Sequence, residues 1–155
     1  VSVNSATGEI TFSSIPNTYT HLQIRGISLN SISYYSIKIR MNGDTGSNYA
    51  EHQLSANGST TSAGGGTGTG ALVAIGATST TSYTGGFVIN IPDYLSTNKN
   101  KTAMGLSGTD GNGSGQVKLC GAMWNSTSAI TSITLYNDGS NFNQYSRFAL
   151  YGLKG

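Results

Sequence analysis

Hydrophobic and polar residues alternate along most of this chain, and an alternation with a period of two predicts short β-strands. The clearest case is the segment Tyr35–Met41. Its apolar side chains share one face, at Tyr35, Ile37, Ile39 and Met41, and its polar ones share the other, at Ser36, Lys38 and Arg40. This pattern is typical of a strand that buries one face and exposes the other.

Two runs near the end of the chain, Ile130–Tyr136 and Arg147–Leu153, show the same alternation. The residues that share an apolar face are Ile133 and Leu135 in the first run, and Phe148 and Leu150 in the second. We expect the final run to lie inside a sheet rather than to form a dispensable tail.

Further strands are predicted at Glu9–Ser13, His21–Ile27, Tyr49–Leu54, Leu72–Ile75, Phe87–Ile91, Thr102–Ser107 and Gln116–Trp124. We expect Tyr49–Leu54 to pair with Tyr35–Met41 across the turn Asn42–Asn48, since Asn-Gly and Thr-Gly tolerate positive φ. The small-residue stretch Asn57–Gly70 buries no apolar area, so we expect a long exposed loop or an extended edge segment. Asp93–Asn100 is predicted to be a polar crossover with room for a short helical turn.

About ten short strands, with turn residues every 8–12 positions, are typical of an all-β sandwich or barrel. No stretch of ten or more residues shows a convincing helical period. The 155 residues fit one domain, residues 1–155. The alternation favours antiparallel sheets with one face exposed to water, and a jelly roll is the predicted arrangement.

The composition shows that the protein has few charged residues. Charged residues make up only 9% of the chain and hydrophobic residues 36%. We expect a rigid β-protein whose surface is rich in hydroxyl and amide groups, as in secreted, cell-surface or virion proteins that pack against copies of themselves. The net charge of +2 is small and scattered, which disfavours a nucleic-acid partner, and no apolar run approaches the roughly 20 residues of a membrane helix.

The sequence offers little for catalysis or for a cofactor. Cys120 is the only cysteine, so there is no internal disulfide, and a buried structural thiol is expected. His21 and His52 are the two histidines; His52 directly follows Glu51, and neighbours on a strand point to opposite faces, so the pair is not a predicted dyad. Gly66–Ala71 loosely matches a dinucleotide fingerprint but lacks a preceding strand and a following helix. We therefore expect neither a cofactor nor catalytic residues.

One weak metal candidate is the segment Asp110–Gly115. Asp110, Asn112 and Ser114 have the alternate spacing of the first half of an EF-hand calcium loop. The twelfth position of such a loop is Gly121 rather than a glutamate. A glycine-rich hairpin tip is the preferred interpretation.

Aromatic residues are the other candidate site, because flat amphipathic rings serve at interfaces and stack on sugar rings. The candidates for contact with a glycan or a protein partner are Tyr34, Tyr83, Tyr94, Tyr145 and Trp124. The four tyrosines lie beside turns and are expected to be exposed. Trp124 ends an apolar strand, so a place in the core is its preferred interpretation.

Several segments resemble a family of small tailed-phage structural proteins. These segments are FSSIPNTYTHLQIRG (12–26), MNGDTGSNY (41–49), YLSTNKNKT (94–102), WNSTSAITSITL (124–135) and FALYGLKG (148–155). They span nearly the whole chain in consistent order. The resemblance implies a β-sandwich or jelly-roll component of the virion surface, on the capsid or the tail, and supplies no catalytic residues.

The leading hypothesis is therefore a non-enzymatic phage virion surface protein, either a capsid decoration or a fibre (knob) module. It would dock on other virion proteins and on its own copies, with trimeric symmetry expected. The alternative is a carbohydrate- or receptor-binding module at a tail-fibre tip that contacts a host surface glycan. A glycan-degrading enzyme is the third class, which six scattered acids make unpromising.

Overall fold

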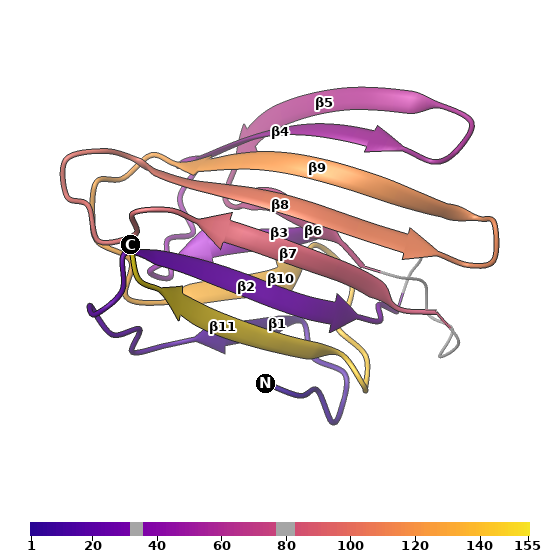
Figure 1. The fold of residues 1–155 in the computed structure, drawn as a ribbon, viewed down its shortest axis with the longest axis horizontal. Coiled ribbons are helices and arrows are strands. Elements are labelled where there is room, and N and C mark those ends of the chain that lie inside the picture. Colours follow the sequence, from indigo (N-terminus) through magenta and orange to yellow (C-terminus); the bar gives the residue numbers. More distant parts are fainter. Residues whose placement is uncertain (32–35, 77–82) are drawn as a thin grey trace.

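Two antiparallel β-sheets packed face to face make up the computed structural model, which describes residues 1–31, 36–76 and 83–155 (Figure 1). The predicted all-β sandwich is confirmed. The strands are β1 (Glu9–Phe12), β2 (His21–Ser28), β3 (Ser36–Met41), β4 (Tyr49–Ala56), β5 (Thr61–Gly68), β6 (Ala71–Ile75), β7 (Gly85–Ile91), β8 (Lys101–Asp110), β9 (Gly115–Trp124), β10 (Ile133–Asn137) and β11 (Arg147–Leu153).

The strand order is consistent with a jelly roll to which strands have been added. The smaller sheet has the order β1-β10-β3-β6 and the larger one the order β11-β2-β7-β8-β9-β4-β5. Without β8, β9 and β11, the larger sheet reads β2-β7-β4-β5, and two four-stranded sheets in these orders form a jelly roll. The hairpin β8–β9 is thus inserted in the middle of the larger sheet, and β11 extends one edge.

The expected pairing of Tyr49–Leu54 with Tyr35–Met41 is wrong. The chain crosses between sheets after β3, so β4 pairs with β5 and β9, while β3 pairs with β10 and β6. Polar groups hold the crossover in place. The Asn42 side chain bonds the backbone of Ala129 and Thr131, at 2.8 Å in each case. The Tyr49 hydroxyl accepts a hydrogen bond from the Met41 backbone N–H at 2.9 Å. The turn Asn42–Asn48, whose residues are typical of a hairpin, therefore connects the smaller sheet to the larger one.

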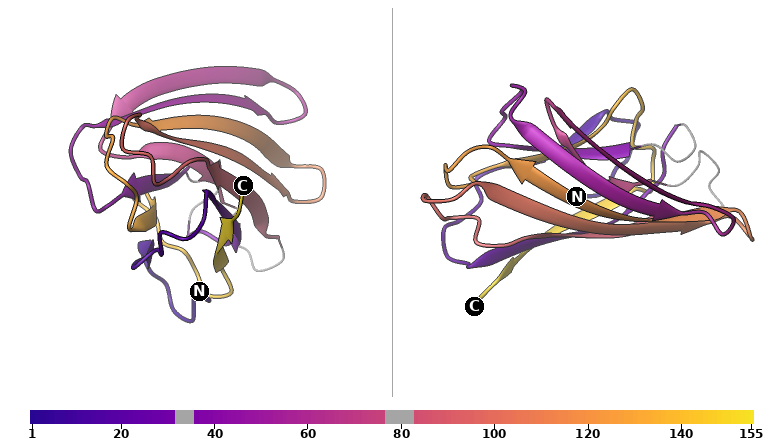
Figure 2. Two further views of the ribbon diagram at one scale, coloured as in Figure 1. Left: turned by 60° about the vertical axis from the view of Figure 1, so that its left-hand side comes forward. Right: turned by 90° about the horizontal axis from the view of Figure 1, so that it is seen from above.

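The glycine-rich stretch forms part of the sheet rather than a loop. β5 is an exposed edge strand paired with β4 along its whole length, so the extended-edge alternative is confirmed. It lies beyond the part of the larger sheet that the smaller sheet covers (Figures 1 and 2). The crossover between β7 and β8 contains turns and no helix. Tyr35, expected at the start of β3, lies outside the described residues.

The core lies between the sheets, as the alternation predicts. Ile24, Ile37, Ile39, Ile89 and Leu135 have no exposed surface. Cys120 is also buried, as expected, and burial raises the pKa of its thiol to about 11.

The inward positions of the inserted strand β8 are occupied mostly by small residues. Ala103, Gly105, Ser107 and Thr109 point inward. A Cβ at Gly105 would lie 1.7 Å from the backbone oxygen of Val73 in β6, so the two layers meet there at backbone distance. The backbone of Val73 leaves no room for a side chain at Gly105, and the large apolar residues of β8, Met104 and Leu106, point outward.

Candidate functional site

The structure does not gather the predicted aromatic residues into one site. Tyr83 is 38% exposed and its ring lies beside Gly111 at the tip between β8 and β9. Tyr145 is 60% exposed, at the turn before β11, where its backbone N–H donates to Val3. Tyr34 lies outside the described residues. Tyr83 and Tyr145, the exposed candidates that the structure describes, therefore occupy different turns.

The expectation that Tyr94 is exposed is wrong. Its side chain is fully buried in the core, and its hydroxyl donates to the backbone oxygen of Pro16. The turn after Pro92 folds back, and the Ile130 N–H bonds the Tyr94 carbonyl at 2.9 Å. A tyrosine beside a turn is thus carried inward, with its polar end satisfied by backbone.

Trp124 belongs to the core, as predicted from its position at the end of an apolar strand. Its ring is 4% exposed and stacks on Tyr49, with centroids 6.5 Å apart. Its Nε1–H donates to the Asp44 carboxylate at 2.7 Å. This bond, with others from Asn48 and Gly46, lowers the pKa of Asp44. Trp124 therefore anchors the β3–β4 crossover and is not available to a ligand.

The calcium candidate is a hairpin tip. β8 ends at Asp110 and β9 begins at Gly115. Asp110 Oδ1 accepts the Gly113 N–H at 2.9 Å, and Asn112 and Gly113 both adopt positive φ. Within the described residues, no three histidine, cysteine or acidic side chains form a group that could hold a metal ion. The carboxylate at the tip is thus engaged in shaping the turn.

The histidines and Glu51 also have separate surroundings. His21 Nδ1 accepts the Asp93 backbone N–H at 3.0 Å. Glu51 points between the sheets, where its carboxylate accepts the Leu72 N–H, while His52 is exposed on the opposite face. Glu51 and His52 therefore lie on opposite faces of β4, as expected for neighbours on a strand.

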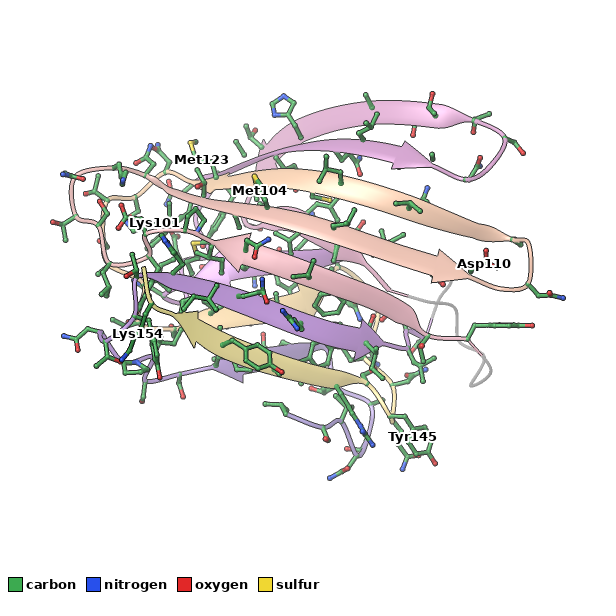
Figure 3. The ribbon with its side chains drawn as sticks, in the orientation of Figure 1. Lys101, Met104, Asp110, Met123, Tyr145 and Lys154 are labelled. Atoms are coloured by element: carbon green, nitrogen blue, oxygen red, sulfur yellow. The ribbon has the colours of Figure 1, made fainter. Side chains whose placement is uncertain are left out.

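Lys101 is a polar core residue that lies just before the predicted strand Thr102–Ser107. Its side chain is 1% exposed, and its ammonium donates to the backbone oxygens of Ser96, Lys99 and Thr127. Burial lowers its pKa. The signal in the sequence is its place in the alternation of β8, in which Lys101 shares the inward face of Ala103 (Figure 3).

The most distinctive surface is the outward side of the larger sheet, where large apolar side chains are exposed. We define the apolar face by five residues that are 50–58% exposed, namely Leu54 on β4, Met104 and Leu106 on β8, and Val117 and Leu119 on β9. The pairing register places Leu106 and Leu54 on either side of Leu119. Three further apolar side chains of this sheet side, Ile27, Tyr151 and Leu153, are 38–47% exposed. A contiguous apolar cluster of this size is a candidate contact surface.

The apolar face has relief, because glycines flank its central row. Leu54, Leu119, Leu106 and Val88 run side by side across four strands. On one side, Gly121 opens a hollow of about 710 Å³ between Met104, Met123, Ala50 and His52. Figure 3 shows Met104 and Met123 beside each other over β8 and β9. On the other side, Gly86 and Gly108 open a hollow of about 410 Å³ beside Leu106 and Val117. The face is therefore a leucine ridge between two hollows.

Polar and charged groups border this face. Among the outward residues of β4, β8 and β9, the ionisable ones are His52 and Asp110. On the β2 side, Arg25 bonds Gln23, and Gln23 bonds Asn90, each at 2.7 Å. Arg25 also lies over the Tyr151 ring, 5.6 Å from its centroid. An apolar centre with a polar border is the usual anatomy of a protein interface.

Comparisons with protein-family models, curated proteins and solved structures found no match to this chain. The described residues include no helix long and apolar enough to cross a membrane.

Proposed function

We propose that this chain is a non-enzymatic surface protein of a phage particle, which docks through the apolar face on other virion proteins and on its own copies. The observation that carries the proposal is the contiguous exposure of Leu54, Met104, Leu106, Val117 and Leu119 on one side of the larger sheet. Together they present on the order of 500 Å² of apolar surface, near the upper end for a typical monomer. Placement on a virion draws on the sequence resemblance.

The state of the acidic residues supports a non-catalytic role. Five of the six acids are engaged by hydrogen bonds or ion pairs: Asp44, Glu51, Asp93, Asp110 and Asp138. The partners are backbone N–H groups, lysines, the Trp124 indole and the Asn48 amide, so no described pair of carboxylates shares a proton. Glycoside hydrolysis requires two facing carboxylates about 5–10 Å apart, and this arrangement offers no evident pair for it.

A glycan is the less favoured partner for this face. Sugar recognition combines aromatic stacking with hydrogen bonds to hydroxyls, whereas the apolar face is built from aliphatic side chains. Tyr83 and Tyr145, which have the required chemistry, lie at separate turns.

The test is the composition of purified phage particles. Wild-type particles should contain the chain in many copies, and the double variant Leu106→Lys, Leu119→Lys should be lost from them. Tyr145→Lys, which removes an equally exposed apolar residue elsewhere, should be retained. A wild-type chain found only as a monomer in the host cytosol, and never on particles, would contradict the proposal.

A further inference from the structure

We infer that the partner on the apolar face is a second copy of this chain, packed sheet to sheet about a twofold axis. The inference rests on the proposed function in that it gives a partner to the same surface. It replaces the expected trimeric contact with an isologous one, since a patch that meets the same patch of another copy does so about a twofold axis.

The shape of the face supports packing against a second copy. Sheets that pack on one another interdigitate the side chains of their facing rows at a separation of about 10 Å. Here the ridge formed by Leu54, Leu119 and Leu106 lies between a hollow over Gly121 and another over Gly86 and Gly108. A Cβ at Gly121 or Gly86 would have no atom within 4 Å. The ridge of one copy therefore has a matching hollow on the other, and a twofold axis satisfies both copies at once.

The distribution of charge on the face also favours a second copy. Partners of different sequence are commonly selected by complementary charges at the interface, and the centre of this face carries none. Arg25 and Arg147 are exposed on β2 and β11, so an interface centred on β8 and β9 leaves both guanidinium groups at its border. Two copies can therefore bring their neutral apolar centres together without placing like charges opposite each other.

The exposed apolar area on this side of the sheet approaches what a stable dimer needs. Eight side chains on this side of the sheet, five of the apolar face with Ile27, Tyr151 and Leu153, are between 38% and 58% exposed. They offer on the order of 700 Å² per copy, close to the roughly 800 Å² that each partner contributes to a standard stable interface. A face-to-face dimer therefore needs little area beyond what is already exposed.

The experiment is sedimentation velocity of the purified full chain over a wide concentration range. The wild type should form a dimer. The variant Leu119→Lys should raise the dissociation constant by about 30-fold or more, because it places a charge in the centre of the interface. Gly121→Leu fills the hollow without adding charge and should weaken the dimer by about tenfold or more. Circular dichroism checks that each variant is folded.

Two matched controls separate this contact from general stickiness. Tyr145→Lys changes an exposed aromatic residue off the face, and Gly66→Leu fills open space over the other face of the sheet. Both should leave the dimer unchanged. A wild type that is monomeric at every concentration, a trimer as the sole multimer, or a dimer that Leu119→Lys and Gly121→Leu leave intact would each overturn the inference.

The particle assay keeps this result separate from the proposed function. If the chain is monomeric in solution but the face variants still remove it from particles, the twofold contact fails and the proposed function stands. If the chain dimerises through this face but is absent from particles, the twofold contact stands and the proposed function fails.

Discussion

The ammonium group of Lys101 illustrates how single residues hold this nearly uncharged protein together. It is buried where three chain segments meet and is satisfied entirely by backbone oxygens of Ser96, Lys99 and Thr127. Such a group links the β7–β8 crossover to the segment after β9. The stabilisation comes from matched hydrogen bonds, since burial alone disfavours the charge.

We expect Lys101→Met to lower the free energy of unfolding by about 2–4 kcal/mol, because it leaves buried carbonyls without a donor. The control is Lys99→Met, two residues away, whose exposed ion pair with Asp93 should be worth at most about 1 kcal/mol. Urea denaturation of both variants measures the difference. Equal effects of the two substitutions would show that the Lys101 contacts contribute nothing specific.

Asp44 and Trp124 make a second residue-scale contact, with a pH dependence of defined sign. The pKa of Asp44 is lowered in the folded state, with the Trp124 indole as the largest cause. The stabilising contribution is therefore complete at neutral pH and is lost as the pH falls below about 4, through the lowered pKa.

Trp124→Phe should accordingly reduce the melting temperature at pH 7, and the gap to wild type should narrow at acidic pH. In NMR titration, the Asp44 pKa should rise toward its ordinary value in the variant. An unchanged Asp44 titration would contradict the assigned role of the indole.

At the scale of elements, β8 shows how one strand sets the spacing of the layers. Gly105 lies against the Val73 backbone, so Gly105→Ala forces the sheets apart. We expect a loss on the order of 3 kcal/mol. Gly66→Ala on β5, where a Cβ has no atom within 4 Å, should change stability by less than about 0.5 kcal/mol. Thermal unfolding distinguishes the two, and a tolerated Gly105→Ala would show that the layers separate at little cost.

The period of two was sufficient to predict most strands and the fold class, because burial on one face imposes alternation directly. It was not sufficient to predict pairing. The turn Asn42–Asn48 has hairpin residues, yet its side chains bond Ala129 and Trp124 from distant segments and direct β4 into the other sheet. The fate of Tyr94 was missed for the same reason, since the Pro16 carbonyl that receives its hydroxyl is 78 residues away.

The apolar face could not be predicted from the sequence, because β8 exposes its large apolar side chains instead of burying them. In β8, the large apolar residues Met104 and Leu106 are exposed, and the inward residues beside them, Ala103, Gly105 and Ser107, are small. Alternation identifies two faces but does not say which one meets the core. That choice depends on Val73 of β6, whose backbone leaves room only for Gly105.

At the scale of the whole molecule, the inserted hairpin β8–β9 is the part of the fold that carries most of the apolar face. The order of the strands that remain without it and β11 is consistent with a jelly roll, and the hairpin brings four of the five residues of the apolar face: Met104, Leu106, Val117 and Leu119. A hairpin inserted for stability alone would carry polar residues on its outer side. Its apolar exterior is explained if the larger sheet is covered in the assembled state.

The most direct test is hydroxyl-radical footprinting of the native assembly against the dissociated chain, read by mass spectrometry. Met104, Leu54 and Leu119 should be oxidised far more slowly in the assembly than in the dissociated chain, while Tyr145 should react equally in both. Equal oxidation of Met104 in the two states would mean that the apolar face is open to water in the assembly, and would contradict this account.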